Sequence, residues 1–275
     1  MDEMPVHAAA QNALQPLTST LPEPDLERRF GTLARLYGEA GAKNIRAAHV
    51  VVVGLGGVGS WAAEALARSG VARLTLVDLD HVAESNINRQ VHALDATVGQ
   101  AKVQAMRQRI LQINPVCQVD CVEEFVDLDN WPAIAGLDSS FGREQTAIID
   151  ACDQVRAKTA MAAWALKHKA IFIAVGAAGG KRLAHKVDID DLAEVTHDPL
   201  LAQLRYRLRK EHGAAREKKI KVMCVFSREA VLQPDNAAQS DGSLNCHGYG
   251  SMVSVTSTFG MCAAGWVIGK FSESA

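Results

Sequence analysis

Short apolar runs alternate with longer amphipathic stretches along most of this chain. The runs have the length and the Val, Ile and Leu content typical of buried strands, and they cover residues 49–53, 73–78, 117–122, 146–150 and 170–175. Apolar residues at helical spacing predict helices over residues 25–46, 58–69, 99–112, 126–135 and 154–168. This alternation predicts an α/β fold, a Rossmann-like doubly wound and mostly parallel sheet with helices on both faces.

The pattern changes after residue 175. It predicts a short strand, a helix and a further strand over residues 186–192, 198–213 and 220–227, followed by a long polar loop over 233–250. Residues 1–24 hold four prolines and no apolar period, so we expect a disordered tail. We expect one domain over 25–271, made of a core over 25–180 and a C-terminal region over 181–271 that packs on it.

Composition sets broad limits on the class of protein. The 275 residues are 48% apolar, which is enough for one large domain, and the net charge of −2 means that a nucleic acid would need a local basic patch. Six cysteines form no CxxC pair and the N-terminus has no long apolar core, so we expect reduced thiols in a cytoplasmic protein. Residues 251–269 are uncharged and as long as a membrane span, but their Gly, Ser and Thr content favours a buried helix over membrane association.

A glycine-rich turn, GLGGVGS, follows the first apolar run. Gly54, Gly56 and Gly59 match the G-x-G-x-x-G pattern, in which glycines allow a tight turn and close approach of the backbone to phosphate. Asp78 ends the next run, at the acidic position that binds ribose in dinucleotide folds. Taken alone, these features favour a dehydrogenase that binds a nicotinamide dinucleotide.

Further charged residues favour a nucleoside triphosphate instead. Arg89 stands in SNINRQ, Lys102 in VGQAK, and Asp153 three residues after Asp150, which ends another strand. A triphosphate carries more negative charge than a pyrophosphate and is bound through Lys or Arg together with Mg²⁺, for which a carboxylate is a suitable ligand. Lys102 as a solvated lysine, and Asp150 and Asp153 as a strand end and a helix cap, are the alternatives.

The ordered set GxGGxGS, DxD, NxxRQ, VGQxK and DxxD resembles the ATP-dependent adenylating enzymes of the ubiquitin-activating class. The resemblance implies ATP and Mg²⁺ as cofactors, with Arg89 and Lys102 on the phosphates and Asp153 on Mg²⁺. It also implies a homodimer, in which Arg35 of an N-terminal helix reaches the partner subunit's ATP; Arg29 is the second candidate. The implied nucleotide contacts are Gly54, Gly56, Gly57, Gly59, Ser60, Asp78 on the ribose, Asp80, Asn86 on the phosphates, and Gln90, which supports its loop.

Within this class, four segments are similar to the subfamily of tRNA threonylcarbamoyladenosine dehydratases. They are RFGTLARLYG at 29–38, THDPL at 196–200, CVFSREAVLQP at 224–234 and GYGSMVSVTSTFG at 248–260. The resemblance implies ATP-dependent adenylation of the threonylcarbamoyl carboxylate on adenosine 37 of tRNA, followed by ring closure and net loss of water. The expected partners are that tRNA, a second copy of the chain and a sulfur-relay protein.

Three other functions stay open from the sequence. Adenylation of a small sulfur-carrier protein uses the same site, but that branch binds zinc through two CxxC pairs, and their absence here predicts no zinc. An oxidoreductase would leave Arg89, Lys102 and Asp153 without a role, and a scaffold would bind the nucleotide without turnover.

A basic segment over residues 205–221 is the candidate tRNA surface. It carries eight Lys or Arg against two Glu, and we expect it to lie beside the active site and follow phosphates. The candidate contacts are Arg205, Arg207, Arg209, Lys210, Lys218 and Lys219. A solvated helix and loop is the alternative. Cys224, in an apolar strand, is expected to be buried, and Cys246 is the candidate reactive thiol.

Overall fold

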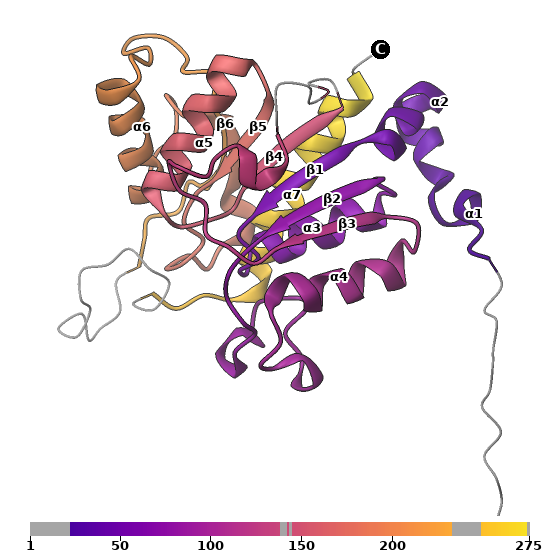
Figure 1. The fold of residues 1–275 in the computed structure, drawn as a ribbon. Coiled ribbons are helices and arrows are strands. Elements are labelled where there is room, and N and C mark those ends of the chain that lie inside the picture. The colour runs from indigo at the N-terminus through magenta and orange to yellow at the C-terminus, as the bar shows by residue number, and fades with distance from the viewer. Residues whose placement is uncertain (1–22, 138–141, 143–144, 233–248, 274–275) are drawn as a thin grey trace, which may run out of the picture.

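One seven-stranded sheet organises the molecule (Figure 1). The computed structural model describes residues 23–137, 142, 145–232 and 249–273. Most of the predicted tail and loop, together with Cys246, lies outside these residues. The strands are β1 His49–Val53, β2 Arg73–Val77, β3 Gln118–Val122, β4 Thr146–Asp150, β5 Ile171–Val175, β6 Val187–Asp191 and β7 Met223–Ser227.

The strand order is β3-β2-β1-β4-β5-β7-β6, and every neighbouring pair is parallel except β6 and β7. The chain builds the sheet outward from β1 to one edge and then returns to continue from β4 to the other. This reversal between β1 and β4 is the switch point where doubly wound folds bind their ligands. The predicted fold class is therefore confirmed, and β6 and β7 of the C-terminal region belong to the same sheet.

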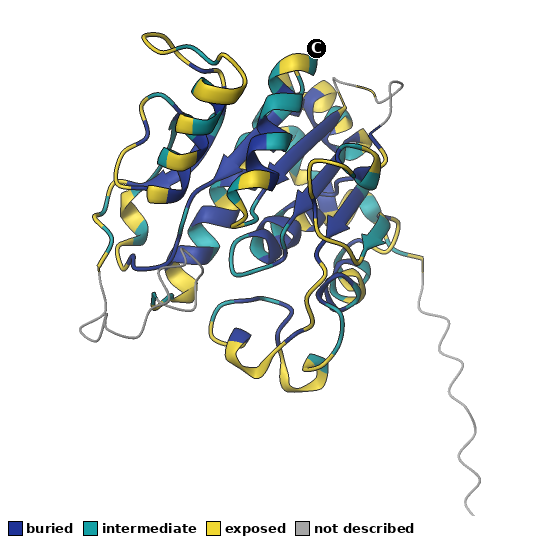
Figure 2. Ribbon diagram, turned by 60° about the vertical axis from the view of Figure 1, so that its left-hand side comes forward, coloured by how far each residue is buried: buried dark blue, intermediate teal, exposed yellow. Residues whose placement is uncertain are grey.

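Helices cover both faces of the sheet. They are α1 Leu26–Phe30, α2 Thr32–Ala47, α3 Gly59–Arg68, α4 Lys102–Ile113, α5 Val155–His168, α6 Pro199–Glu211 and α7 Val253–Glu273. Side chains alternate along β1, so that Val50 and Val52 pack with α3, α4 and α7, whereas Val51 and Val53 pack with α5 and α6. Figure 2 shows the result as a buried sheet between helices whose outer faces are exposed.

Two helix predictions differ from the structure. The helix predicted over 25–46 is broken between α1 and α2 at Gly31 and is kinked again at Gly38, whose φ of 73° is incompatible with a continuous right-handed helix. The helix predicted over 126–135 is wrong, because only the short 3₁₀ turn η3 Ala133–Ala135 forms there. The Asp127 carboxylate instead accepts the N–H groups of residues 129 and 130, and this local turn competes with a helix.

The uncharged segment 251–269 forms most of α7, which packs against α3 and the sheet. Its buried residues include Val255, Phe259, Ala263 and Val267. Gly260 allows close contact, because a Cβ there would lie 2.4 Å from the carbonyl oxygen of Val58. Within the described residues, no helix has the length and apolar character that crossing a membrane requires. The buried-helix interpretation of this segment is confirmed.

Candidate active site

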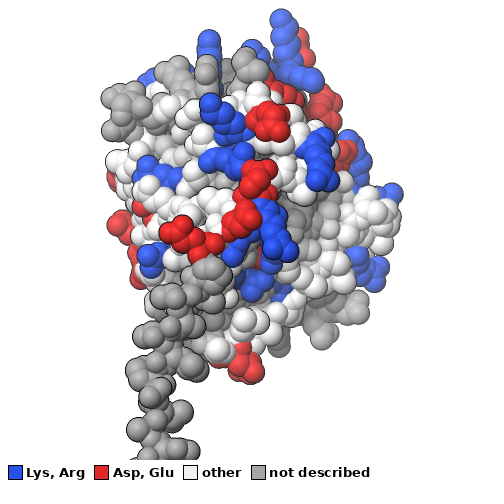
Figure 3. Space-filling view, turned by 90° about the vertical axis from the view of Figure 1, so that its right-hand side faces the viewer, with Lys and Arg blue, Asp and Glu red and all other residues white. Residues whose placement is uncertain are grey.

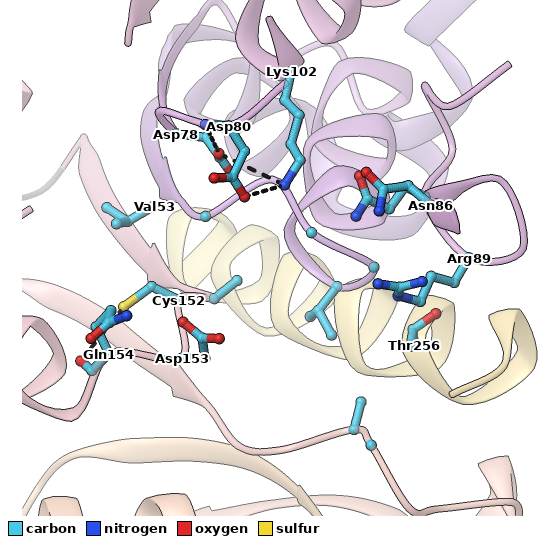
Figure 4. Close-up of a pocket in the computed structure, with 18 of the residues that line it drawn as sticks. Val53, Asp78, Asp80, Asn86, Arg89, Lys102, Cys152, Asp153, Gln154 and Thr256 are labelled. Carbon is cyan, nitrogen blue, oxygen red and sulfur yellow. Dashed lines mark hydrogen bonds and ion pairs between the residues drawn. The ribbon is translucent and has the colours of Figure 1, made fainter. Parts of the chain in front are cut away.

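A cavity of about 530 Å³ opens at the carboxyl edge of the sheet, at the switch point. Its wall combines the loop after β1, the ends of β2 and β4, and the loops after β3 and β5. The crossover from β2 to α4 adds Asn86, Arg89 and Gln90, and α7 adds Thr256. Figure 4 shows Lys102 and Asp80 on one side of this cavity, Asp153 on another and Arg89 beside Thr256.

The glycine loop brings the backbone of the first turn of α3 close to the cavity. Gly54 has a φ of 86°, and a Cβ on Gly59 would lie only 1.8 Å from the carbonyl oxygen of Gly54. Gly56 faces open space, and no side chain caps the N-terminus of α3. The loop therefore presents free backbone and the positive end of a helix dipole to a phosphate group. Ser60 is buried behind it and accepts the N–H of Val91.

Asp78 is fixed beside this loop at the end of β2. Its carboxylate accepts the N–H of Leu55 at 2.6 Å and that of Asp80 at 2.9 Å. Burial raises the pKa of this carboxyl group, while the Lys102 charge opposes that shift. The structure thus holds a carboxylate at the carboxyl end of β2, the position at which the sequence analysis expects a ribose contact.

Lys102 begins α4 and faces the cavity although its side chain is almost fully buried. Its Nζ lies 2.6 Å from the Asp80 carboxylate and 3.9 Å from that of Asp78 (Figure 4). A buried ammonium group requires a nearby negative charge. A solvated surface lysine is therefore excluded at this position.

Arg89 presents its guanidinium group to the cavity. Nη1 donates to the carbonyl of Ser85 and to the side chain of Asn88, and no carboxylate of the described residues forms an ion pair with it. The indole N–H of Trp61 donates to the Arg89 carbonyl and ties this segment to α3. Asn86 Oδ1 accepts the N–H of Ala83, which leaves its amide N–H groups for other acceptors.

Asp150 and Asp153 have different roles, although both follow β4 in sequence. Asp150 is fully buried and pairs with the equally buried Lys158 at 2.9 Å. Asp153 is exposed, lines the cavity and accepts no hydrogen bond from the described residues. The N-cap of α5 is Gln154, so the capping alternative for Asp153 is wrong. Of the two, Asp153 is the carboxylate available to a ligand.

Several cavity residues were not predicted from the sequence. They include Cys152, Thr256, Phe125 and the Gly176–Gly179 backbone. The Cys152 thiol donates to Asp150, and burial raises its pKa well above the usual value, so it stays protonated. Residues of this kind carry no motif, because only the packing of α7 and the ends of β3 and β5 brings them to the site. The five described cysteines are free, and Cys224 is buried as expected.

Arg35 lies away from this cavity. It is exposed on α2, in a surface hollow with Asp25, Glu27 and Glu39. On the face of the molecule shown in Figure 3, basic and acidic side chains are interspersed rather than gathered into a patch of one sign. Because Arg35 does not line the cavity, a single chain does not bring it to the residues expected to bind the nucleotide.

The basic segment 205–221 does not lie beside the cavity. The segment runs along α6 and ends just before β7. Because β7 is parallel to β5, the start of β7 lies at the amino edge of the sheet, opposite the cavity. Arg205 donates to the carbonyls of residues 192 and 195, and Arg209 donates to those of residues 215 and 216. Arg207 pairs with Glu211, whereas Lys210, Lys218 and Lys219 are exposed. The two helix arginines thus stabilise the local fold.

The fold and the cavity together define a doubly wound α/β protein with a nucleotide site at its switch point. The model of the ThiF family matches residues 29–267, and this chain belongs to that family. It is 42% identical to the tRNA threonylcarbamoyladenosine dehydratase of Escherichia coli, over 90% of this chain and 95% of that protein. The dehydratase of Haemophilus influenzae is 36% identical, over 89% of this chain and 93% of the relative.

A solved structure shares the fold along nearly the whole chain. The E. coli tRNA N6-threonylcarbamoyladenosine dehydratase in complex with ATP superposes with a TM-score of 0.80, at 41% identity over 90% of this chain and 96% of that one. The expected class of adenylating enzyme and the expected subfamily are therefore confirmed.

Proposed function

We propose that this enzyme uses ATP to dehydrate the threonylcarbamoyl group on adenosine 37 of tRNA to its cyclic form. The observation that carries the proposal is that Arg89, Lys102 and Asp153 line a cavity of the dinucleotide-binding type. The chain is also 42% identical to a tRNA threonylcarbamoyladenosine dehydratase. A nicotinamide dinucleotide would leave two cations and a carboxylate without a role. We also propose that residues 25–271 act as one adenylating domain in the cytoplasm.

The reaction divides into two steps at one carbonyl carbon. A carboxylate oxygen of the substrate attacks the α-phosphorus of ATP, and pyrophosphate leaves as the acyl-adenylate forms. A heteroatom of the same side chain then attacks the activated carbonyl, and AMP departs with the original carboxylate oxygen. The net change is the loss of one water molecule from the nucleoside. Positioning and charge neutralisation suffice for both steps, so no enzyme nucleophile is needed.

The nucleotide would lie along the carboxyl edge of the sheet. Asp78 would bind the ribose, with Asp80 and Gln90 supporting it from their loops. The glycine loop, from Gly54 to Ser60, would bind phosphates through its backbone together with Asn86. Arg89 and Lys102 would neutralise the β- and γ-phosphates, and Lys102 would exchange its Asp80 partner for them. The free backbone, the fixed carboxylate and the two cations around the cavity support these roles.

Mg²⁺ suits the chemistry of the Asp153 position. Mg²⁺ is bound by one or two carboxylates together with phosphate oxygens and water, rather than by a full protein cage. The described residues contain no cluster of three or more metal-ligating side chains, but Asp153 is exposed in the cavity with a free carboxylate. We propose that Asp153 holds the ion, which would neutralise phosphate charge when bound.

Two protein partners belong to this proposal. We propose a homodimer on the resemblance to the adenylating class: Arg35 is exposed on α2, away from the cavity, and would reach phosphates only across an interface with a second copy. A sulfur-relay protein is the other expected partner.

For the tRNA, the exposed Lys210, Lys218 and Lys219, with Arg207, would contact backbone phosphates at a distance from the modified nucleotide. Replacing Lys218 and Lys219 with Glu should weaken tRNA binding and flatten its salt dependence. Arg107→Glu should change neither, because Arg107 is on α4 beside the outermost strand β3, on the other side of the sheet from α6.

The test is ATP-dependent turnover with tRNA that carries threonylcarbamoyladenosine. We expect pyrophosphate and AMP in equal amounts, and a digested nucleoside lighter by one water in mass spectrometry. Release only with a sulfur-carrier protein ending in Gly-Gly would keep the adenylation site and replace the substrate. The lack of any CxxC pair argues against that second function.

A further inference from the structure

The loop that follows β5 forms one wall of the cavity from backbone alone. Its sequence, GAAGG at residues 176–180, offers no charged or hydroxyl side chain, yet Gly176, Ala177, Ala178 and Gly179 all line the cavity. Any polar recognition by this wall must therefore come from peptide N–H and carbonyl groups.

Two N–H groups of this loop have no partner among the described residues. The N–H groups around them are satisfied, since Gly176 donates to the Val225 carbonyl, Ala177 to the Asp198 carboxylate and Gly180 to the Gly250 carbonyl. Between them, those of Ala178 and Gly179 find no acceptor in residues 23–137, 142, 145–232 or 249–273. Both residues are buried. Because buried N–H groups are rarely left unpaired in folded proteins, two in succession on a cavity wall are donors that a ligand with acceptor atoms would satisfy.

The loop is held in one conformation from both sides. Asp198, which is 5% exposed, accepts the N–H of Ala177 through one oxygen and that of Leu201 through the other. A Cβ on Gly176 would lie 2.1 Å from the Asp198 carboxylate, so only glycine fits there. On the far side, the buried Lys181 ammonium donates to the carbonyls of His197 and Glu229. The free N–H groups are thus fixed before a ligand arrives, which is the condition for strong electrostatic stabilisation.

The position of the loop puts it on the phosphate side of the cavity. β5 lies next to β4, with Asp150 paired to Ala174, so the residues that follow these strands, Asp153 and the loop, are neighbours at the carboxyl edge. β2, with Asp78, lies on the other side of β1. A nucleotide whose ribose is at Asp78 and whose phosphates cross the glycine loop therefore extends from β2 toward β4, which brings its phosphates near Asp153 and the loop.

We propose that the backbone N–H groups of Ala178 and Gly179 bind the substrate carboxylate and later form the oxyanion hole for ring closure. Neutral donors orient a carboxylate without pairing it to a cation, so its second oxygen keeps the charge needed to attack the α-phosphorus. After adenylation the bound oxygen is the carbonyl oxygen, on which negative charge develops when the ring-closing atom attacks. This assignment rests on the proposed function and names how its substrate is held.

The experiment removes each N–H without changing a side chain. Ala178 is replaced by lactic acid and, separately, Gly179 by glycolic acid through nonsense suppression, which exchanges the amide for an ester. The same exchange at the exposed Ala96 is the matched control. Measured quantities are the ATP dissociation constant without tRNA, pyrophosphate release in a single turnover, the formation of the dehydrated nucleoside, and the thermal midpoint of unfolding.

We expect ATP affinity within threefold of that of the unmodified protein, and pyrophosphate release slower by more than threefold, because the carboxylate loses an orienting donor. Formation of the dehydrated nucleoside should be slower by about 10²–10³-fold for each ester, the range for loss of one oxyanion donor. Release within threefold for both esters would overturn the assignment, as would a loss of ATP affinity as large as the loss of rate. If the unmodified protein releases no pyrophosphate with the modified tRNA, the proposed function fails and the assignment with it. Normal release by both the unmodified and the ester proteins refutes the carboxylate site alone.

Discussion

Lys102 and Asp153 differ in what each must give up before a nucleotide binds. Lys102 is 2.6 Å from Asp80 and, in the proposed role, would exchange that partner for phosphate, whereas Asp153 has no partner to lose among the described residues. In that exchange the Lys102 ammonium group would leave the Asp80 carboxylate and bind a phosphate group within the same cavity. The free carboxylate at Asp153 is exposed, so its removal leaves the folded state nearly unchanged.

Replacing Asp153 with Asn should therefore separate catalysis from stability. We expect pyrophosphate release to fall by at least about 10²-fold, because a charge at the reacting phosphates is lost, with a thermal midpoint close to that of the wild type. Glu124→Gln, which neutralises another exposed carboxylate of the cavity wall, is the matched control and should stay within a few-fold. Equal effects of both changes, or full turnover by the Asp153→Asn variant, would exclude Asp153 from the phosphate site.

Two histidines, the half-buried His49 and the buried His92, make the fold sensitive to acid. Burial, aided by the Arg73 charge at His49 and by Lys102 and Arg109 at His92, lowers the pKa of both from 6.5 to about 4. Both are neutral in the folded state and take up a proton on unfolding below pH 6.5. Stability should therefore fall as the pH drops from 6.5 toward 4, by about 1.4 kcal/mol per pH unit for each histidine.

His92 offers the clearer test of this acid dependence, because neither ring nitrogen has a hydrogen-bond partner among the residues that the structure describes. His92→Phe should flatten the decline in the urea midpoint between pH 6.5 and 4.5 while keeping activity near pH 7. An unchanged slope would mean that His92 is not the group that takes up the proton.

At the scale of elements, α7 supports the glycine loop from behind. The contact depends on Gly260, whose Cβ position lies 2.4 Å from the Val58 carbonyl oxygen and 2.9 Å from the Ala62 nitrogen. Val58 is the N-cap of α3, so a side chain at residue 260 pushes against the helix end that faces the cavity.

Gly260→Val should destabilise the protein by about 1–3 kcal/mol and weaken ATP binding as well, because an overpacked contact moves the loop. Gly265→Ala and Gly269→Ala lie on the same helix with no atom within 4 Å of the added Cβ, and should instead be neutral or stabilising by up to about 1 kcal/mol. Urea unfolding and ATP titration of the three variants measure both effects. Equal stability of all three would show that α7 does not press on the loop.

Elements with a clear period were predictable from sequence, and contacts between them were not. The strands at 49–53 and 146–150 match β1 and β4, because buried parallel strands are continuous apolar runs. The helix predicted over 126–135 does not form, because the Asp127 carboxylate binds backbone N–H groups in a turn, and the spacing of apolar residues gives no information on such a hydrogen bond. Sequence motifs predict that Lys102 and Asp153 lie at the site. The placement of the Ala178 and Gly179 N–H groups depends on backbone geometry, which no sequence motif indicates.

For the whole molecule, the sheet separates two kinds of surface. Its carboxyl edge carries the cavity and its chemistry, while the basic end of α6 and the loop before β7 lie at the amino edge. A tRNA that presents its modified nucleotide to the cavity would need to extend past the sheet to meet those lysines. Arg35 belongs to neither surface, so the proposed contact of Arg35 with phosphate would need a second copy of the chain.

A mixing experiment decides whether Arg35 acts across an interface. Arg35→Ala and Asp153→Asn should each be inactive alone, but a mixed dimer holds one complete site, with Asp153 from the first variant and Arg35 from the second. After denaturation and refolding at equal amounts, we expect about a quarter of wild-type pyrophosphate release, because half of the dimers are mixed and one of their two sites is complete. No recovery, with dimers present by light scattering, would mean that Arg35 does not serve the partner's site. Recovery in the mixture, but not when either variant is refolded alone, places Arg35 in the partner's active site and makes the dimer the catalytic unit.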